Sequence, residues 1–190
     1  MSGKQSLDTL SLVWRYWQAH IRPGAFCIDA TAGRGNDTEA LCRLVGNEGQ
    51  VLAFDIQQEA VRATQDRLAK AGLEAQVIEA SHTEMAQYAA PGSVDAIVFN
   101  LGYLPRADHH VATQPETTVA AIDVGLALLR VGGIMTVCVY HGGDTGFAER
   151  DAVLAHLVVL DNRRFTVLVS TFSNRPNHPP IAVLVIKESE

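Results

Sequence analysis

Asp29-Ala-Thr-Ala-Gly33-Arg-Gly35-Asn-Asp37-Thr38 is the stretch of sequence that decides the fold. It follows a short apolar run at 25–28 and precedes a helical pattern at 39–45. A strand, a glycine turn and a helix in this order are typical of a site for a nucleotide-type ligand. Glycine lets the backbone approach the ligand closely, and the first turn of a helix presents free N–H groups.

A second acid supports this interpretation. Asp55 ends the next predicted strand, 50–55, about twenty residues after the glycine turn. In open sheets built from strands and helices, an acid at this position can accept hydrogen bonds from both hydroxyls of a ribose. The two segments together therefore predict a nucleoside-containing ligand.

The glycine turn also bears on the class of that ligand. Gly33 and Gly35 match the first two glycines of the dinucleotide fingerprint, but Thr38 stands at the third position. Asp37 lies at the expected helix start, where a carboxylate repels phosphate and suits a cation. S-adenosylmethionine carries a sulfonium and an ammonium and no phosphate, so this pattern favours it over NAD. An ordinary turn with an Asp or Thr helix cap is the alternative that stays open.

Length and composition predict one domain over residues 1–190, with an amphipathic helix at its N-terminal end. No apolar run approaches the ~20 residues of a membrane span, and no secretory leader is evident, so we expect a cytoplasmic protein. The three cysteines lack metal-type spacing, and no metal site is expected. A net charge of −6 argues against tight binding of long nucleic acids through their phosphates.

Apolar periodicity predicts strands that alternate with helices, which indicates a mostly parallel sheet covered on both faces. The expected strands are 25–29, 50–55, 76–78, 94–99, 134–140, 165–170 and 181–186. The expected helices after the N-terminal one are 38–45, 59–70, 117–129 and 148–160. The loop 173–180 has no helix, so the last strand pair should be antiparallel. The predicted fold class is α/β, with the seven-stranded Rossmann-like outline of a class I methyltransferase.

Ligands of such sheets bind beyond the carboxyl ends of the strands. Asn100 follows the fourth predicted strand, and its side-chain oxygen could accept an N–H of an amine so that the nitrogen lone pair points at a methyl donor. Tyr103 could stack on a base or flank the developing cation. His141, after the fifth strand, is a candidate acceptor for the amine proton. A capped turn with a packed tyrosine is the structural alternative.

Two further groups of residues are candidates for binding. Ser81 and His82 follow the third strand and are expected to line the adenosine pocket or to form a solvent-facing turn. Arg106 and His109, with Arg175 from the last loop, are candidate substrate contacts to phosphate, and solvated surface positions are the alternative.

The chain resembles the YtqB/MnmM-type methyltransferases, a family first described as rRNA methylases. The matching segments are 29–38, 53–57, 81–82, 99–105, 140–143 and 174–180. The resemblance implies a class I fold, S-adenosylmethionine as donor, and methylation of the exocyclic amine of 5-aminomethyl-(2-thio)uridine in a tRNA anticodon. It places cofactor contacts at Asp37, Asp55, Gln57 and His82. Arg34 stands where the family has Asn, and the histidine of the 140–143 segment is shifted.

The expected partner is therefore the anticodon region of tRNA, whose unpaired wobble base is presented at low cost. The alternatives are a methyltransferase that acts on rRNA or on a small-molecule amine, and, in another class, a non-catalytic nucleotide-binding module. No membrane partner is expected, and a homodimer is one option for the assembly.

Overall fold

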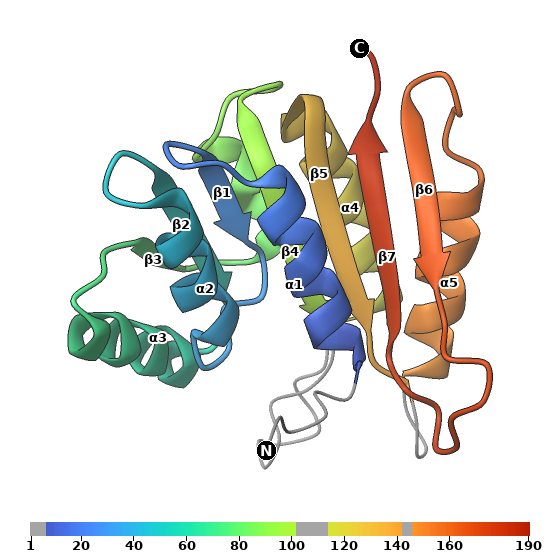
Figure 1. Ribbon diagram of the computed structural model, residues 1–190, viewed down its shortest axis with the longest axis horizontal. Coiled ribbons are helices and arrows are strands. Elements are labelled where there is room, and N and C mark those ends of the chain that lie inside the picture. Colours follow the sequence, from blue (N-terminus) through green and yellow to red (C-terminus); the bar gives the residue numbers. More distant parts are fainter. Residues whose placement is uncertain (1–6, 102–113, 142–145) are drawn as a thin grey trace, which may run out of the picture.

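A single seven-stranded sheet forms the centre of the protein, as Figure 1 shows. The computed structural model describes residues 7–101, 114–141 and 146–190. The strands lie in the order β3-β2-β1-β4-β5-β7-β6. They are β1 (Phe26–Asp29), β2 (Gln50–Asp55), β3 (Gln76–Glu79), β4 (Val94–Leu101), β5 (Leu129–Val139), β6 (Phe165–Ser170) and β7 (Ile181–Lys187). Only β7 is antiparallel to its neighbours, so the predicted mostly parallel sheet with an antiparallel last pair is confirmed.

Helices cover both faces of the sheet (Figure 1). They are α1 (Thr9–His20), α2 (Asn36–Val45), α3 (Gln58–Ala71), α4 (Pro115–Leu128) and α5 (Phe147–Val158), with the short 3-10 helix η1 (His82–Gln87) after β3. Buried side chains of α1, α2 and α3 form one core layer, and those of η1, α4 and α5 form the other. The sequence pattern did not predict η1. Among the helices that the structure describes, none is long and apolar enough to cross a bilayer.

The helix α1 is capped at its first turn and is hydrogen-bonded to the sheet near its C-terminal end. Asp8 caps its first turn, where the Asp8 carboxylate accepts the N–H of Ser11 at 2.7 Å. Near its C-terminal end, the buried Trp17 donates its indole N–H to the Thr136 hydroxyl of β5 at 2.9 Å. The predicted N-terminal helix is therefore confirmed as part of the core, and it brings its first turn to the carboxyl edge of β5.

The start of β5 differs from the prediction. The sequence predicted a helix to 129 that Gly132-Gly133 ends, but α4 stops at Leu128 and both glycines lie inside β5. The pairing with β4 shifts register between Val94 and Ala96, which marks a β-bulge or a similar irregularity of the ladder. Gly132 has φ +77, and a Cβ on Gly133 would lie 2.9–3.1 Å from three backbone oxygens. These glycines therefore serve the bulge and its close backbone contacts, and they are not a helix stop.

Gly35 is the position where the glycine turn tolerates least change. Its φ is +75, and an added Cβ would lie 2.9 Å from the backbone Cα of Thr64 on α3. We expect Gly35→Ala to lower the free energy of unfolding by about 3 kcal/mol, from left-handed strain plus overlap. Gly72→Ala is the matched control, because Gly72 has φ +65 and open space around the added carbon. It should cost about 1 kcal/mol. Equal losses in urea unfolding would contradict the packing argument.

Candidate functional site

The glycine turn is tied to the end of β2 by the carboxylate of Asp55. The Asp55 Oδ2 atom accepts the N–H of Gly33 at 2.9 Å, and Oδ1 accepts the N–H of Gln57 at 2.9 Å. A carboxylate oxygen can accept two hydrogen bonds, so each one keeps capacity for a ligand hydroxyl. The half-buried Asp55 thus combines two tasks: it fixes the turn and presents two charged acceptors, as a ribose requires.

Asp29 supports the same turn from inside the protein. Its side chain is 0% exposed, and it accepts the Thr38 hydroxyl at 2.6 Å and the Thr31 N–H at 3.1 Å. Both oxygens are therefore engaged by the turn itself. The structure gives Asp29 a scaffolding position, and its expected contact with the cofactor stays a prediction.

Asp37 and Asn100 meet across the turn, although 63 residues separate them. The Asn100 side-chain nitrogen Nδ2 donates to Asp37 Oδ2 at 3.0 Å, and the Asn100 backbone N–H donates to the Thr31 hydroxyl at 2.7 Å. The side chain of Trp14 on α1 lies near Asp37 and, after Asn100, partly offsets the rise that burial causes in the pKa of Asp37. Because Asp37 holds the amide nitrogen, the amide oxygen Oδ1 of Asn100 faces away from Asp37.

The oxygen Asn100 Oδ1 is unusual in its hydrogen bonding. Among the buried side-chain polar atoms of the described residues, it is the one without a hydrogen-bond partner. A buried acceptor without a partner costs about 1–3 kcal/mol, so its retention calls for an explanation. The Tyr140 hydroxyl lies close to Asn100 and Asp37, and burial raises the pKa of Tyr140 to about 12. Tyr140 therefore stays neutral and protonated beside the amide.

The site is electrostatically prepared for a cation. Burial, reinforced by Asp37, raises the pKa of Asp29 to about 7, and burial also raises the pKa of Asp37. Within the part of the chain that the structure describes, no ion pair involves Asp29, Asp37 or Asp55. Three carboxylates without a described cationic partner fit a ligand that carries positive charge, as the sulfonium and ammonium of S-adenosylmethionine do.

This arrangement predicts a pH-dependent affinity. A bound cation favours ionised carboxylates and lowers their pKa, so binding releases protons, and affinity should rise with pH through the raised pKa values of Asp29 and Asp37. We expect the preference for S-adenosylmethionine over S-adenosylhomocysteine, whose sulfur is neutral, to grow by up to about 10-fold per pH unit as the pH rises toward the pKa of Asp29, about 7. Calorimetry with both ligands checks this. Asp37→Asn should flatten the difference, and parallel profiles in the wild type would contradict the argument.

Ser81 and His82 lie at the start of η1, beyond the end of β3. Ser81 caps η1, since its Oγ accepts the N–H of Thr83 at 3.2 Å while the Glu84 carboxylate accepts the N–H of Ser81 at 3.2 Å. The His82 ring contacts Phe99 edge-on, with 6.0 Å between ring centroids, and burial lowers the pKa of His82 below its ordinary value. His82 is therefore neutral near pH 7. The cap explains Ser81 structurally, and the expected contacts of both residues with adenosine stay predictions.

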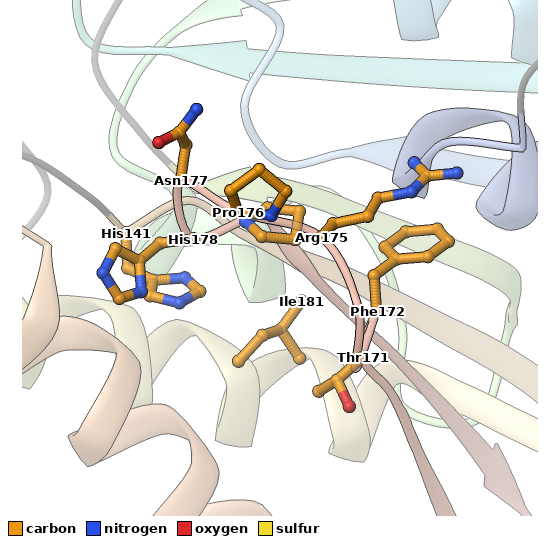
Figure 2. A pocket seen from close by; sticks show the side chains of 9 residues that line it. His141, Thr171, Phe172, Arg175, Pro176, Asn177, His178 and Ile181 are labelled. Carbon is orange, nitrogen blue, oxygen red and sulfur yellow. The ribbon is translucent and has the colours of Figure 1, made fainter.

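The structure groups His141 with the last loop. Its ring centroid lies 5.8 Å from those of Phe147 and His178. His141 lines a pocket of about 330 Å³ together with eight residues from the segment 171–181, among them Phe172, Arg175 and His178 (Figure 2). The other residues expected to bind or orient the substrate, Tyr103, Arg106 and His109, lie outside the described residues. Arg163 and Arg164 precede β6. They therefore lie at the end of that strand opposite the pocket.

Sequence reasoning missed several residues of the site. Thr31 and Tyr140 contact the Asn100 neighbourhood, and Trp14 reaches Asp37 from α1. Ile56, directly after Asp55, is 59% exposed and offers an apolar surface beside the carboxylate that is expected to bind a ribose. The sequence could have indicated Ile56, because this apolar residue directly follows the acid that ends a predicted strand. No local pattern indicates Trp14. In the described ranges, no group of three or more His, Cys, Asp or Glu could hold a metal ion.

Comparisons with known proteins identify a family of methyltransferases. The family model described as “Putative rRNA methylase” matches residues 51–186. A chloroplastic tRNA (mnm5s2U34)-methyltransferase of Arabidopsis thaliana is 30% identical over 184 residues, which cover 91% of this chain and 67% of the relative.

Two solved structures are similar over nearly the whole chain. One, described as a “putative rRNA-methylase”, is from Clostridium thermocellum, with 40% identity, TM-score 0.93, and coverage of 96% of this chain and 99% of that one. The other, a “putative methyltransferase” from Streptococcus mutans in complex with S-adenosylhomocysteine, has 35% identity, TM-score 0.87, and coverage of 96% and 99%. The chain therefore belongs to the rRNA methylase family, whose members are S-adenosylmethionine-dependent methyltransferases of the class I fold.

Proposed function

We propose that this protein is an N-methyltransferase that acts on the aminomethyl group of 5-aminomethyl-(2-thio)uridine at the wobble position of tRNA. The observation that carries the proposal is the buried, unpartnered oxygen of Asn100 beside an acid-rich turn. An amine with two N–H groups supplies the donor that this oxygen lacks. A tRNA substrate also agrees with action in the cytoplasm.

The residues around Asn100 account for orientation of the acceptor. S-adenosylmethionine, when bound, supplies an electrophilic methyl group on a positively charged sulfur. Asn100 Oδ1 accepts one N–H of the neutral amine, and the nitrogen lone pair then points forward for in-line attack. The new bond is N–CH₃, the bond that breaks is CH₃–S⁺, and the extra proton on nitrogen leaves. Orientation of this kind can supply up to about 7–11 kcal/mol of the barrier.

Asp37 helps because it fixes which end of the Asn100 amide faces the substrate. Its carboxylate accepts from the amide nitrogen at 3.0 Å, so the flipped amide, with oxygen against carboxylate, is disfavoured. Before attack the alkyl amine must lose a proton, since its pKa resembles that of lysine, about 10.4. His141 stays the candidate acceptor from the sequence.

The choice of tRNA over other acceptors is supported by the name of the Arabidopsis relative, a tRNA (mnm5s2U34)-methyltransferase. The main alternative is an rRNA methyltransferase, which the family description favours. A small-molecule amine is the other candidate, and the net charge of −6 favours it, because an acidic protein gains little from phosphate contacts.

Mass spectrometry of nucleosides separates these candidates. In a strain that lacks the gene, 5-aminomethyl-(2-thio)uridine should accumulate in tRNA at the expense of its methylated form. Incubation of that tRNA with the purified protein and S-adenosylmethionine should restore the methylated nucleoside. An unchanged tRNA profile, together with a lost methyl group in rRNA, would replace the tRNA proposal with the rRNA one. The absence of methyl transfer to any RNA would favour a small-molecule acceptor.

A further inference from the structure

We propose that the pocket between the end of β5 and the loop joining β6 to β7 binds one nucleotide of a single-stranded RNA, next to the nucleotide that receives the methyl group. This inference depends on the proposed function for the class of substrate. Figure 2 shows the rings of His141 and His178 on one side of the pocket and the Phe172 and Arg175 side chains on the other.

The charge of the pocket contrasts with that of the chain. Among the described residues, its lining includes Arg175, His141 and His178 and contains no Asp or Glu, whereas the whole chain has a net charge of −6. A lining with one arginine, two imidazoles and no carboxylate suits an anionic group. The volume, about 330 Å³, is suited to a ligand of small-molecule size, such as a single nucleotide unit.

Arg175 is held in a position suited to bind a phosphate. Its guanidinium carbon lies 4.0 Å from the centre of the Phe172 ring, and one of its N–H groups donates to the carbonyl of Leu7. Hydrogen bonds from Ser11 and, to a smaller extent, the charge of Arg175 lower the pKa of Asp8, but Asp8 and Arg175 form no ion pair among the described residues. A guanidinium has five N–H donors, so several are left for phosphate oxygens.

The ring cluster offers the complementary surface for a base. His178 lies 5.8 Å from His141 and 5.7 Å from Phe147, centroid to centroid. Asn177 and His178 both have positive φ, 65° and 47°, which non-glycine residues rarely adopt. This backbone places the His178 ring in the pocket. Aromatic and imidazole rings stack on bases of any identity, as recognition of a flanking nucleotide requires.

The pocket also lies at a suitable distance from the acceptor position. Leu101, next to Asn100, pairs with Val139 of β5, and Val139 pairs with Ile181, which lines the pocket. Two strand spacings amount to about 10 Å. A strand of RNA that presents its amine at Asn100 can therefore place a neighbouring nucleotide in this pocket.

Binding of RNA to the protein loaded with S-adenosylhomocysteine tests the inference without any turnover. The probe is a fluorescein-labelled single-stranded RNA of about seven nucleotides, measured by anisotropy. Arg175→Gln retains a donor for the Leu7 carbonyl, and His178→Asn retains a residue that tolerates positive φ. Each should weaken binding about 10-fold. Arg175→Gln should also reduce the slope of log affinity against log salt by about 0.7, and His178→Asn should not.

Arg163→Gln is the matched control, since it removes the same charge from a side chain that is 85% exposed at the far end of β6. Its affinity should stay within about twofold of the wild type. Pocket variants that bind RNA like the wild type would overturn the inference alone. RNA binding that depends on the pocket, without methyl transfer to tRNA, would overturn the proposed function alone. A wild type that binds no RNA would overturn both.

Discussion

Asn100→Ala is expected to lower kcat for methyl transfer by about 10²–10³-fold, while affinity for S-adenosylhomocysteine stays within about threefold of the wild type. The loss follows from removal of the buried oxygen that has no partner within the described protein. An interaction that aligns the reacting nitrogen is worth most in the transition state, so kcat falls and not only KM rises. Single-turnover rates with saturating donor and calorimetry with the product measure the two quantities separately.

Asn47→Ala provides the control for this experiment. Asn47 is exposed in the turn between α2 and β2, so the same atoms are removed far from the site. It should leave both rate and affinity unchanged. Normal turnover in Asn100→Ala would reject the amine-orienting role. Equal losses of turnover and product affinity would instead assign Asn100 to the cofactor pocket.

Asp55→Ala is expected to reduce affinity for S-adenosylmethionine at least about 10²-fold. Hydrogen bonds to a charged acceptor contribute about 1.5–3 kcal/mol each, and two ribose hydroxyls lose theirs. The substitution also removes the acceptor for the Gly33 and Gln57 N–H groups, so the glycine turn loses its tie to β2. Calorimetry measures the affinity, and thermal unfolding measures the second effect.

Two further variants separate charge from geometry at Asp55. Asp66→Asn removes an exposed carboxylate of α3, and it should leave affinity unchanged. Asp55→Asn keeps the size, but its NH₂ group faces a backbone N–H that needs an acceptor, so it should resemble Asp55→Ala more than the wild type. If Asp55→Ala bound S-adenosylmethionine with wild-type affinity, the ribose would have to bind elsewhere. The cofactor site could then no longer be assigned to the carboxyl edge of the sheet at β2.

Much of the fold could be predicted because its signals are local. The glycine turn, the acid that ends β2 and the alternation of strands with helices each lie within one short window, and each was confirmed. The beginning of β5 could not be read in this way, since Gly132-Gly133 is also a plausible helix stop. The bulge that requires these glycines depends on pairing with β4, some 35 residues earlier.

The sequence predicted the site residues that follow strands, but it did not predict the contacts between the segments that carry them. Asp55 and Asn100 follow predicted strands, so topology alone brings them to one edge. The contacts of Asp37 with Asn100 and with Trp14 join segments far apart in the chain, and a single sequence contains no signal for such pairs. The structural role of Asp29 was missed for the same reason: its burial depends on the packing of the turn over β1.

The position of β7 affects how the protein folds during its synthesis on the ribosome. This strand follows every other in the chain, yet it occupies an interior place between β5 and β6. Until Ile181–Lys187 has emerged, β5 and β6 each expose an unpaired edge, and exposed edges promote association between nascent chains. Completion of the sheet thus waits for residues 181–187 to be synthesised, and a ribosome stalled before them holds a partly folded, aggregation-prone chain.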